Sequence, residues 1–479
     1  MKDEWYFEIG DGQVYGPYPM DKLRKWAEAG NLMPTHRVRH ADSQEWVIAA
    51  YVDGLELTTT TSEKKAPAKE APASKGMFGF GKAKPIETDT KPINAPQLCD
   101  ELLETAFARG ASDIHVDPEE NMLLLQLRID GALEPLLKRP KADHAAIVSR
   151  FKVLAGMDIA EHREAQDGRF MRELGKDKRR IDIRVACLPT THGERLTMRL
   201  LAVDAGRMTL NRLGMSESGR NLFTSAIDSR QGMVLLTGPT GSGKSTTLYA
   251  ALRHRMASEP GRIITVEDPV EFDLVGVSQV EVDTADKVAF GTVLRNILRS
   301  DPDVIMIGEM RDFESADTGI KAALTGHLVI SSLHTNSAAG AVTRLVDMGV
   351  DAFLVAATLR LCAAQRLLRR LCPKCRVRRP LTAAEARALA RPEIEGVEVY
   401  DAGGCKDCRE RGYCGRVGVF EILPITLEMQ RMITDRAGEV ALTKAALEQG
   451  GQTMRDDAVD KLLTGQTSFV EVLPLGPWE

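Results

Sequence analysis

The chain has 479 residues and a formal net charge of −5, and aromatic residues make up only 5% of it. This length allows two to four domains, and the acidic balance argues against general affinity for nucleic acid. No apolar run approaches the ~18–20 residues that span a bilayer, and the first residues lack the layout of a signal peptide. We therefore expect a cytoplasmic protein whose eight cysteines serve as ligands or core residues rather than disulfides.

The first fifty residues are rich in aromatic side chains, which predicts a small folded domain over residues 1–53. Residues 54–92 are rich in Thr, Lys, Ala, Pro and Gly and predict a flexible linker. Helical apolar spacing resumes at 95–109 and closes on Gly110, which is placed as a C-cap. Segments 121–130 and 179–188 have the pattern of strands, and 146–156 that of a helix. From about residue 206 onward, short apolar runs alternate with helical stretches, which indicates an α/β domain on a largely parallel sheet.

The strongest local signal is a phosphate-binding loop between an apolar strand (MVLLT) and a helix. Its glycines let backbone N–H groups surround phosphates at a helix N-terminus. Lys244 is placed to reach the β- and γ-phosphates, and the Ser245 hydroxyl to ligate Mg²⁺. The pattern therefore predicts ATP and Mg²⁺ as cofactors. The sequence contains no N-K-x-D motif, which a GTPase would use to recognise guanine. The expected nucleotide-binding residues are Gly238, Pro239, Thr240, Gly241, Ser242, Gly243, Lys244, Ser245 and Thr246.

Two later strands end in carboxylates, and a third lies between two histidines. DVIMIGE places Glu309 at the end of a Walker B-like strand, where an acid supports Mg²⁺ through water or polarises the attacking water. IITVEDPVEF ends in acids, of which Glu267 is the predicted water-activating residue, while Asp268 and Glu271 can instead cap the next helix. His327 and His334 flank the third strand; either can be structural, and His334 is the candidate γ-phosphate sensor.

Two C-x-x-C pairs follow, separated by a helical stretch. Four thiolates at this spacing can close a tetrahedral structural Zn²⁺ site, and a redox pair is the alternative. Cys414 is left out of the first coordination shell, and the other three cysteines are expected in the core. The predicted ligands are Cys372, Cys375, Cys405 and Cys408.

Together, GPTGSGKST, IITVEDPVE, LRSDPDVIMIGEMRD and TGHLVISSLHTN resemble the type II secretion and type IV pilus ATPase superfamily over about residues 93–479. The resemblance implies a RecA-like motor domain (206–479) preceded by a PAS-like α+β domain (93–205). Ser315 and Ser332 stand where the family usually has threonine. In such rings, arginines of the PAS-like domain reach the phosphates at a subunit interface. The matching positions are Arg169 and Arg184, with Arg195 a weaker match; the alternative is pairing with Asp167 and Asp182.

The cysteine module is predicted over 368–415 and is followed by a predicted helical region at 416–479. It resembles a four-cysteine insertion that assembly-type members of the family carry and retraction-type members lack. The resemblance implies a homohexamer at the cytoplasmic face of the inner membrane, associated through platform proteins and with no direct nucleic-acid partner. We expect ATP hydrolysis to drive pseudopilus or pilus assembly. A DNA-transfer or DNA-uptake motor and a retraction ATPase remain the alternatives, and a regulatory ring is a third. Basic residues around the module can face lipid, a partner or only solvent.

The front domain resembles GYF-like domains through a WYF…GP…L…W…G…W pattern. Such domains bind proline-rich peptides through exposed aromatic side chains. The candidates here are Tyr6, Tyr15, Tyr18 and Trp26, and the alternative is that these rings form the small domain's own core.

Overall fold

The computed structural model describes residues 4–8, 14–28, 32, 37–42, 46–49, 52, 94–201, 209–282 and 290–476. Two compact units are present, Met1–Ala83 and Lys84–Glu479. The predicted linker at 54–92 lies outside the described residues. Among the described residues, no helix has the length and apolar content needed to cross a bilayer.

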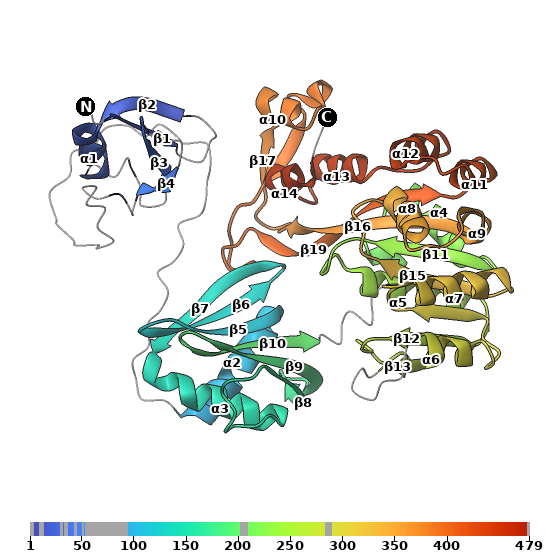
Figure 1. Cartoon of the computed structure of the whole chain (residues 1–479), viewed down its shortest axis with the longest axis horizontal. Coiled ribbons are helices and arrows are strands. Elements are labelled where there is room, and N and C mark those ends of the chain that lie inside the picture. Colours follow the sequence, from blue (N-terminus) through green and yellow to red (C-terminus); the bar gives the residue numbers. More distant parts are fainter. Residues whose placement is uncertain are drawn as a thin grey trace. The chain divides into compact units, whose positions relative to one another are not determined.

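In the first unit, four strands form a sheet in the order β2-β1-β3-β4, and one helix accompanies it (Figure 1). Leu23 and Val38 are fully buried in its core, with Phe7, Tyr18 and Trp26 packed against them. The bounds are β1 Glu4–Glu8, β2 Val14–Pro19, α1 Met20–Glu28, β3 Arg37–His40 and β4 Val47–Ile48.

The second unit begins with a six-stranded antiparallel sheet in the order β7-β6-β5-β10-β9-β8. Fully buried and partly buried residues alternate along β6, because one face of the sheet carries the core and the other does not. Helices α2 and α3 pack against the sheet and each other, and Gly110 ends α2 in the left-handed region, as predicted. The bounds are α2 Ala95–Arg109, β5 Ala111–Pro118, β6 Met122–Ile129, β7 Ala132–Pro140, α3 His144–Ala155, β8 Gln166–Leu174, β9 Arg179–Thr190 and β10 Gly193–Leu201.

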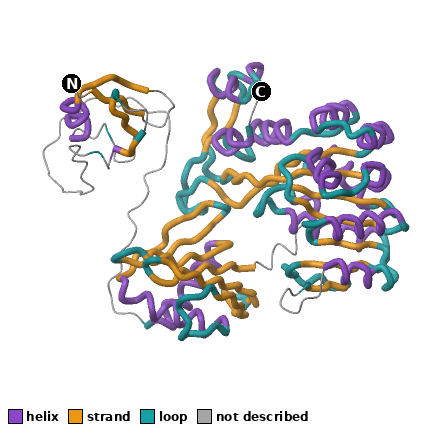
Figure 2. Tube along the Cα trace, viewed as in Figure 1, coloured by secondary structure: helices purple, strands orange, loops and turns teal. Residues whose placement is uncertain are grey.

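A seven-stranded sheet in the order β13-β12-β14-β15-β11-β16-β19 forms the rest of the unit, with helices on both faces (Figure 2). All neighbouring strands are parallel except β16 and β19, which confirms the predicted, largely parallel α/β sheet. Met233 and Leu235 of β11 enter one core, and Val234 and Leu236 enter the core on the other face. Burial on both faces explains why these strands are apolar throughout.

The elements of this sheet and its first helices are α4 Glu217–Ile227, β11 Gly232–Thr237, α5 Lys244–Ser258, β12 Ile263–Glu267, β13 Ser278–Glu281, α6 Phe290–Ile297, β14 Val304–Ile307, α7 Phe313–Leu324, β15 Leu328–Leu333, α8 Ala338–Asp347, α9 Ala352–Thr358, β16 Leu359–Leu371 and β19 Tyr413–Pro424. Between β16 and β19 lie β17 Val377–Pro380, α10 Ala383–Ala388 and β18 Glu398–Asp401. The chain continues with α11 Leu427–Thr434, α12 Glu439–Glu448, α13 Met454–Leu463 and α14 Phe469–Val472.

One boundary differs from the sequence prediction. The region expected to be helical from residue 416 onward begins as strand β19, which runs to Pro424 beside β16. Val417, Val419 and Phe420 are buried there, so pairing with β16 decides the structure of this segment. The helices start only at Leu427.

Candidate functional site

The loop between β11 and α5 has the backbone that phosphate binding requires. Gly238, Gly241 and Gly243 have φ values of 145°, 80° and 91°, a region that side chains rarely adopt. A Cβ on Gly238 would lie 2.5 Å from the Gln365 carbonyl oxygen, so the close approach of β16 also requires glycine. Helix α5 starts at Lys244 with no side chain capping its first N–H groups. These donors therefore remain available to a bound anion.

Three side chains of this loop carry the polar chemistry. The Lys244 ammonium donates to the carbonyl oxygens of Gly238 and Pro239 at 2.7 and 3.2 Å. Burial lowers the pKa of Lys244, which the carboxylates of Glu309 and Glu271 oppose. The Ser242 hydroxyl is buried and finds no hydrogen-bond partner among the described residues, while the Ser245 hydroxyl donates to Glu271 Oε1 at 3.2 Å. An unpartnered buried hydroxyl inside a glycine loop fits a nucleotide phosphate, and the hydroxyl and carboxylate oxygens fit Mg²⁺.

Glu309 follows strand β14 and meets two cationic side chains. His334, just beyond β15, lies 2.8 Å from Glu309 Oε2 through Nε2. Arg311 forms an ion pair with the same carboxylate, and its guanidinium is also 3.5 Å from Asp268. Arg311 was not among the site residues predicted from the sequence. His327 lies at the other end of β15, where Nδ1 is 2.9 Å from the Ala322 carbonyl oxygen, so its contact is structural.

Glu267, at the end of β12, is only 4% exposed and accepts several hydrogen bonds. Thr265 donates to its Oε1 at 2.6 Å and Gln279 at 3.1 Å, and the Tyr249 hydroxyl donates to Oε2. The structure thus places Glu267 next to the loop but holds its carboxylate firmly. Glu271, four residues on, is exposed instead.

The arginines of the antiparallel sheet form a row across neighbouring strands. Arg169 of β8 is the register partner of Arg184 on β9, which is the partner of Arg199 on β10. Arg184 donates to the Val270 carbonyl oxygen at 3.2 Å, and Arg169 is 3.7 Å from Glu281. These contacts go to the segment after β12 and to β13, not to Asp167 or Asp182.

Arg195 is not part of this row. It is paired with Asp117 at 2.5 Å. Arg199, which sequence reasoning missed, is paired with Asp113 at 3.0 Å. The missed signal was its cross-strand register with Arg184, which becomes visible only once the hairpin between β9 and β10 is known.

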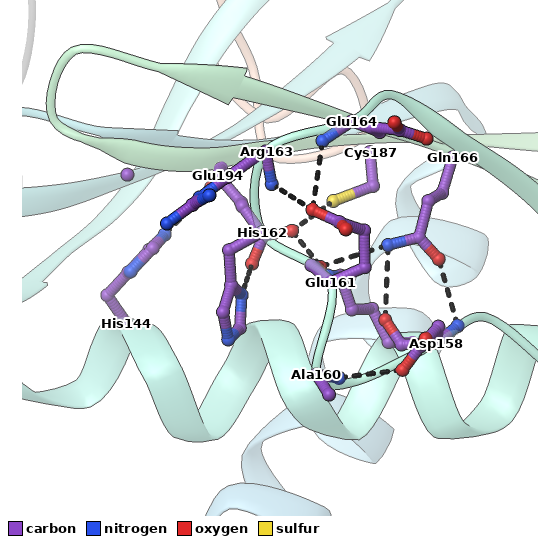
Figure 3. A network of polar contacts seen from close by, with 12 residues as sticks. His144, Asp158, Ala160, Glu161, His162, Arg163, Glu164, Gln166, Cys187 and Glu194 are labelled. Atoms are coloured by element: carbon purple, nitrogen blue, oxygen red, sulfur yellow. Dashed lines mark hydrogen bonds and ion pairs between the residues drawn. The ribbon is translucent and has the colours of Figure 1, made fainter.

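A buried polar network fixes the segment that leads into β8 (Figure 3). The Glu194 carboxylate forms an ion pair with the fully buried ammonium of Lys152. It also lies 2.7 Å from His162 Nδ1 and accepts a hydrogen bond from the Cys187 thiol at 3.2 Å. Lys152 also donates to the Glu161 carbonyl oxygen at 2.5 Å. Gln166 ties the same segment to Asp158. The strand that carries Arg169 therefore starts from a rigid support.

The loop, the acids, His334 and part of the arginine row face one cavity of about 1590 Å³. Arg184 and Arg199 line it from the antiparallel sheet, whereas Arg169 and Arg195 do not. From the parallel sheet it is lined by Lys244, Ser245, Glu267, Glu271, Glu309, Arg311 and His334, among others.

The four predicted zinc ligands come together at the far end of β16. Their sulfur atoms all lie within 4.8 Å of one another, with separations of 3.9 Å for Cys372–Cys405, 3.6 Å for Cys375–Cys408 and 3.7 Å for Cys405–Cys408. Tetrahedral zinc–thiolate geometry requires sulfur separations of about 3.8 Å, so the donor set fits Zn²⁺. Burial alone would raise the pKa of Cys408, but backbone N–H donors from Cys405 and Gly412 lower it to about 7. Cys414 is exposed, and Cys99, Cys187 and Cys362 are buried, as expected.

The basic residues around this module are mostly paired within the chain. Arg369 binds Glu471, Arg378 binds Glu398 and Arg379 binds Glu385 and Asp401. Lys374 is 2.7 Å from Asp407. This internal pairing favours a structural role over a free lipid-binding patch.

In the front domain, two of the four candidate aromatics pack inward. Tyr18 and Trp26 have ring centroids 4.9 Å apart, and Trp26 lies 5.3 Å from Phe7. Arg39 lies over the ring of Tyr6. The side chain of Tyr15 lies outside the described residues. The core interpretation therefore accounts for Tyr18 and Trp26.

The glycine-rich loop with Lys244 and Ser245 lies between a parallel strand and a helix, and neighbouring strands of the same sheet end at carboxylates. This combination defines a P-loop ATPase. The type II/IV secretion system protein family model matches residues 87–474, and the GYF domain 2 model matches residues 5–55. The chain belongs to the type II/IV secretion system protein family and carries a GYF-like domain at its front.

Curated relatives and solved structures agree with this assignment. Type II secretion system protein E of Aeromonas hydrophila is 43% identical over 408 residues, or 85% of this chain and 79% of that protein. The type IV pilus assembly ATPase PilB of Myxococcus xanthus is 42% identical over 382 residues, or 79% of this chain and 67% of that protein. The Legionella pneumophila ATPase DotB shares the fold, with a TM-score of 0.60 and 23% identity over 81% of this chain and 98% of that one. The pilus retraction motor PilT with bound ADP has a TM-score of 0.54 and 25% identity over 79% and 96%.

Proposed function

We propose that this ATPase is an assembly-type motor, which powers a type II secretion pseudopilus or a type IV pilus as a homohexamer at the inner membrane. The single observation that carries the proposal is the cavity in which the P-loop, Glu309, His334 and two arginines of the antiparallel sheet meet. Arginines from a separate domain at a phosphate site couple hydrolysis to domain movement. The names of the relatives support both machines, since they include secretion and pilus assembly proteins.

The residues divide the chemistry as follows. Backbone N–H groups of Gly241 and Gly243 and the Lys244 ammonium bind the phosphates, and Ser245 would hold Mg²⁺. When bound, this ion neutralises charge on the phosphate oxygens. Glu267 orients the attacking water, and Glu309 supports the metal side and fixes His334 at 2.8 Å, where the imidazole senses the γ-phosphate.

Arginines supply charge from the other sheet. Arg184 and Arg199 line the cavity and present guanidinium groups to the transferring phosphoryl group. Arg169 pairs with Glu281 outside that lining, so we assign it to the interface with a neighbouring subunit.

The cysteine cluster supports the assembly class. Cys372, Cys375, Cys405 and Cys408 would hold Zn²⁺ with no open coordination position, so the ion contributes to folding rather than to catalysis. Platform proteins of the machine are the proposed partners, and a proline-rich segment is the proposed ligand of the front domain.

The test is ATP hydrolysis by the full chain and by Lys244→Ala. The variant should keep the wild-type melting temperature and lose nearly all turnover, and a hexamer should appear in mass photometry. Normal hydrolysis by Lys244→Ala would refute the ATP site. Strong stimulation of ATP hydrolysis by DNA would instead indicate a DNA-transfer motor. Loss of pilus retraction alone in a deletion strain would instead indicate a retraction motor.

A further inference from the structure

The segment that follows the cysteine cluster reaches the antiparallel sheet. Residues 409–415, here called the knuckle, run from the last cysteine of the cluster into the start of β19. The Arg409 guanidinium donates to the Ala108 carbonyl oxygen at 2.7 Å, near the end of α2. The Gly415 N–H donates to the Asp130 carboxylate at 3.1 Å, in the turn between β6 and β7. The knuckle therefore joins parts of the chain that lie as much as 301 residues apart in the sequence.

Arg411 is the central charge of this contact. Its Nη1 lies 3.6 Å from Asp130 and 3.6 Å from Glu134. The three side chains are only 21%, 17% and 32% exposed, so water and salt screen these ion pairs less than pairs on the open surface. The Nε of Arg411 donates to the Cys408 carbonyl oxygen at 3.2 Å. A cysteine of the cluster thus fixes the guanidinium on one side, and two acids of the antiparallel sheet fix it on the other.

The cysteines also hold the knuckle in shape. The Gly412 N–H donates to Cys408 Sγ at 3.2 Å, and the Gly412 carbonyl oxygen accepts from the Cys372 N–H at 2.9 Å. Arg409 and Glu410 have φ values of 53° and 61°, in the left-handed region that residues other than glycine rarely adopt. Such a backbone persists only where its surroundings hold it. Here the holding contacts run to two of the four predicted zinc ligands.

The acid at the other end of the contact is connected to the arginine row. Asp130 comes two residues after Arg128 of β6, whose guanidinium donates to the Gly131 carbonyl oxygen at 2.9 Å. Arg128 is the register partner of Asp113 on β5, and Asp113 pairs with Arg199 at 3.0 Å. A short path of contacts therefore leads from the turn at Asp130 to Arg199, which lines the cavity.

The knuckle contacts differ in place from the other contacts of the antiparallel sheet. Arg184 bonds the Val270 carbonyl oxygen in the acidic segment after β12 (residues 267–271), beside the cavity. A bound nucleotide competes for that guanidinium, because phosphate attracts it more strongly than a carbonyl oxygen does. Asp130 and Arg411 do not line the cavity. Their contact can therefore persist while nucleotide binds and leaves.

We propose that the knuckle is a clasp that holds the antiparallel sheet against the start of β19 and so positions Arg199 at the phosphate loop. The cysteine cluster, loaded with zinc, keeps the clasp in shape. This inference rests on the proposed zinc and ATP sites, and it gives the cluster a role beyond folding. Asp130 and Arg411 are positioning residues, and loss of zinc loosens the contact between the two sheets while the chain stays folded.

The experiment follows the distance between the two sheets in the full chain by single-molecule energy transfer. Two dyes are attached through p-azidophenylalanine at the exposed positions of Glu120, before β6, and Glu448, at the end of α12, so that no cysteine is modified. Labelled chain is mixed with excess unlabelled chain, so that each assembly carries one dye pair. Wild type should give one narrow distribution of transfer efficiency. Asp130→Asn and Arg411→Gln should each broaden it and keep the wild-type zinc content.

Steady-state kinetics provide a second measurement. Each variant should lower kcat about fivefold, as expected for the loss of one shielded ion pair. Affinity for N-methylanthraniloyl ATP should stay within about twofold of wild type, because the phosphate loop is unchanged. The double variant should lose little more than Arg411→Gln alone, since both changes break the same contact. Asparagine keeps the size of Asp130 and tolerates its left-handed backbone, with φ of 52°.

Two controls separate the clasp from the stability of the cluster. Lys374→Gln removes an ion pair to Asp407 that lies between the two C-x-x-C pairs, 2.7 Å long, and should leave the distribution and kcat unchanged. Removal of zinc from wild type by a chelator should broaden the distribution as Arg411→Gln does, and should add little to that variant. Circular dichroism and melting temperatures show that each sample is folded.

Three outcomes overturn the inference. A narrow distribution and wild-type kcat in both Asp130→Asn and Arg411→Gln would show that the knuckle does not hold the sheet. Equal changes in Lys374→Gln would assign the effect to the stability of the cluster. A distribution that stays narrow after zinc removal would exclude the cluster from the clasp. Wild-type chain without zinc is a different failure, which refutes the four-thiolate site, and normal hydrolysis by Lys244→Ala refutes the ATP site.

Discussion

Arg184 of β9 and Arg199 of β10 are direct cross-strand partners, and both line the cavity of the phosphate loop. Two guanidinium groups side by side repel each other unless anions lie nearby. Asp113 lies 3.0 Å from Arg199, while Arg184 donates to a carbonyl oxygen of the acidic segment. The pair is therefore suited to a ligand that carries several negative charges.

The first prediction concerns this pair. Arg199→Ala should lower kcat for ATP hydrolysis by at least tenfold, because an arginine at the transferring phosphoryl group stabilises transition-state charge. The matched control is Arg195→Ala, four residues before Arg199 on the same strand and paired with Asp117 outside the cavity lining. Steady-state kinetics should show little change in that control. Equal losses in both variants would contradict a phosphate role for Arg199.

The second prediction separates the two histidines of β15. His334→Ala should lower kcat while nucleotide affinity stays close to wild type, since His334 contacts Glu309 and lines the cavity. His327→Ala should instead lower the melting temperature and leave kcat unchanged, because its ring bonds the end of α7. Kinetics and thermal unfolding on both variants decide the matter, and a kcat loss only in His327→Ala would reverse the assignment.

The third prediction concerns the cysteine cluster. The purified chain should contain one zinc ion per subunit by elemental analysis, and Cys408→Ser should contain much less. The variant should unfold at lower temperature, because binding of structural zinc stabilises the folded state. Cys414→Ser is the control, as Cys414 is exposed and outside the cluster. Wild-type zinc content in Cys408→Ser would rule out the four-thiolate site.

The fourth prediction is a pH dependence centred on Glu421 of β19. Burial raises the pKa of this carboxyl from its ordinary value to about 7, although backbone N–H groups of Ala338 and Ala339 oppose the shift. Since the folded state holds this proton more tightly than the unfolded state, its contribution to stability is fully present below about pH 4.5. It is lost as the pH rises to about 7.

Glu421→Gln should remove this dependence. The free energy of unfolding of wild type relative to the variant should fall by up to ~3 kcal/mol between pH 4.5 and 7.5. Denaturant unfolding of both proteins at these two pH values measures it. Parallel pH profiles would show that folding does not shift the pKa of Glu421.

Sequence patterns predicted elements far better than the relations between them. The apolar strands, Gly110 as a C-cap and the loop at 238–245 depend on local spacing, and all appear where expected. Arg195 and Arg199 lie on the same face of β10, and only pairing with β5 and β9 decides which one reaches the cavity. That register depends on a hairpin whose geometry apolar spacing does not encode.

The two glutamates of the acidic segment show the same limit. Both follow one apolar strand, and nothing in their spacing says which carboxylate is enclosed. The difference arises from Tyr249, eighteen residues upstream of Glu267, and from Gln279 on the next strand. Such contacts join separate elements and become visible only in the folded chain.

Strand β16 has a mechanical consequence. It is 13 residues long, so it extends ~40 Å, with parallel pairing to β11 near its start and Cys372 just past its end. Gln365, midway along it, accepts a hydrogen bond from Thr247 of the nucleotide-binding helix at 2.8 Å. Because β19 pairs with it along much of its length, β16 is expected to be rigid, and one end of it is anchored beside the nucleotide-binding loop. A tilt of a few degrees at Gln365 would therefore displace the cysteines by about an ångström or more.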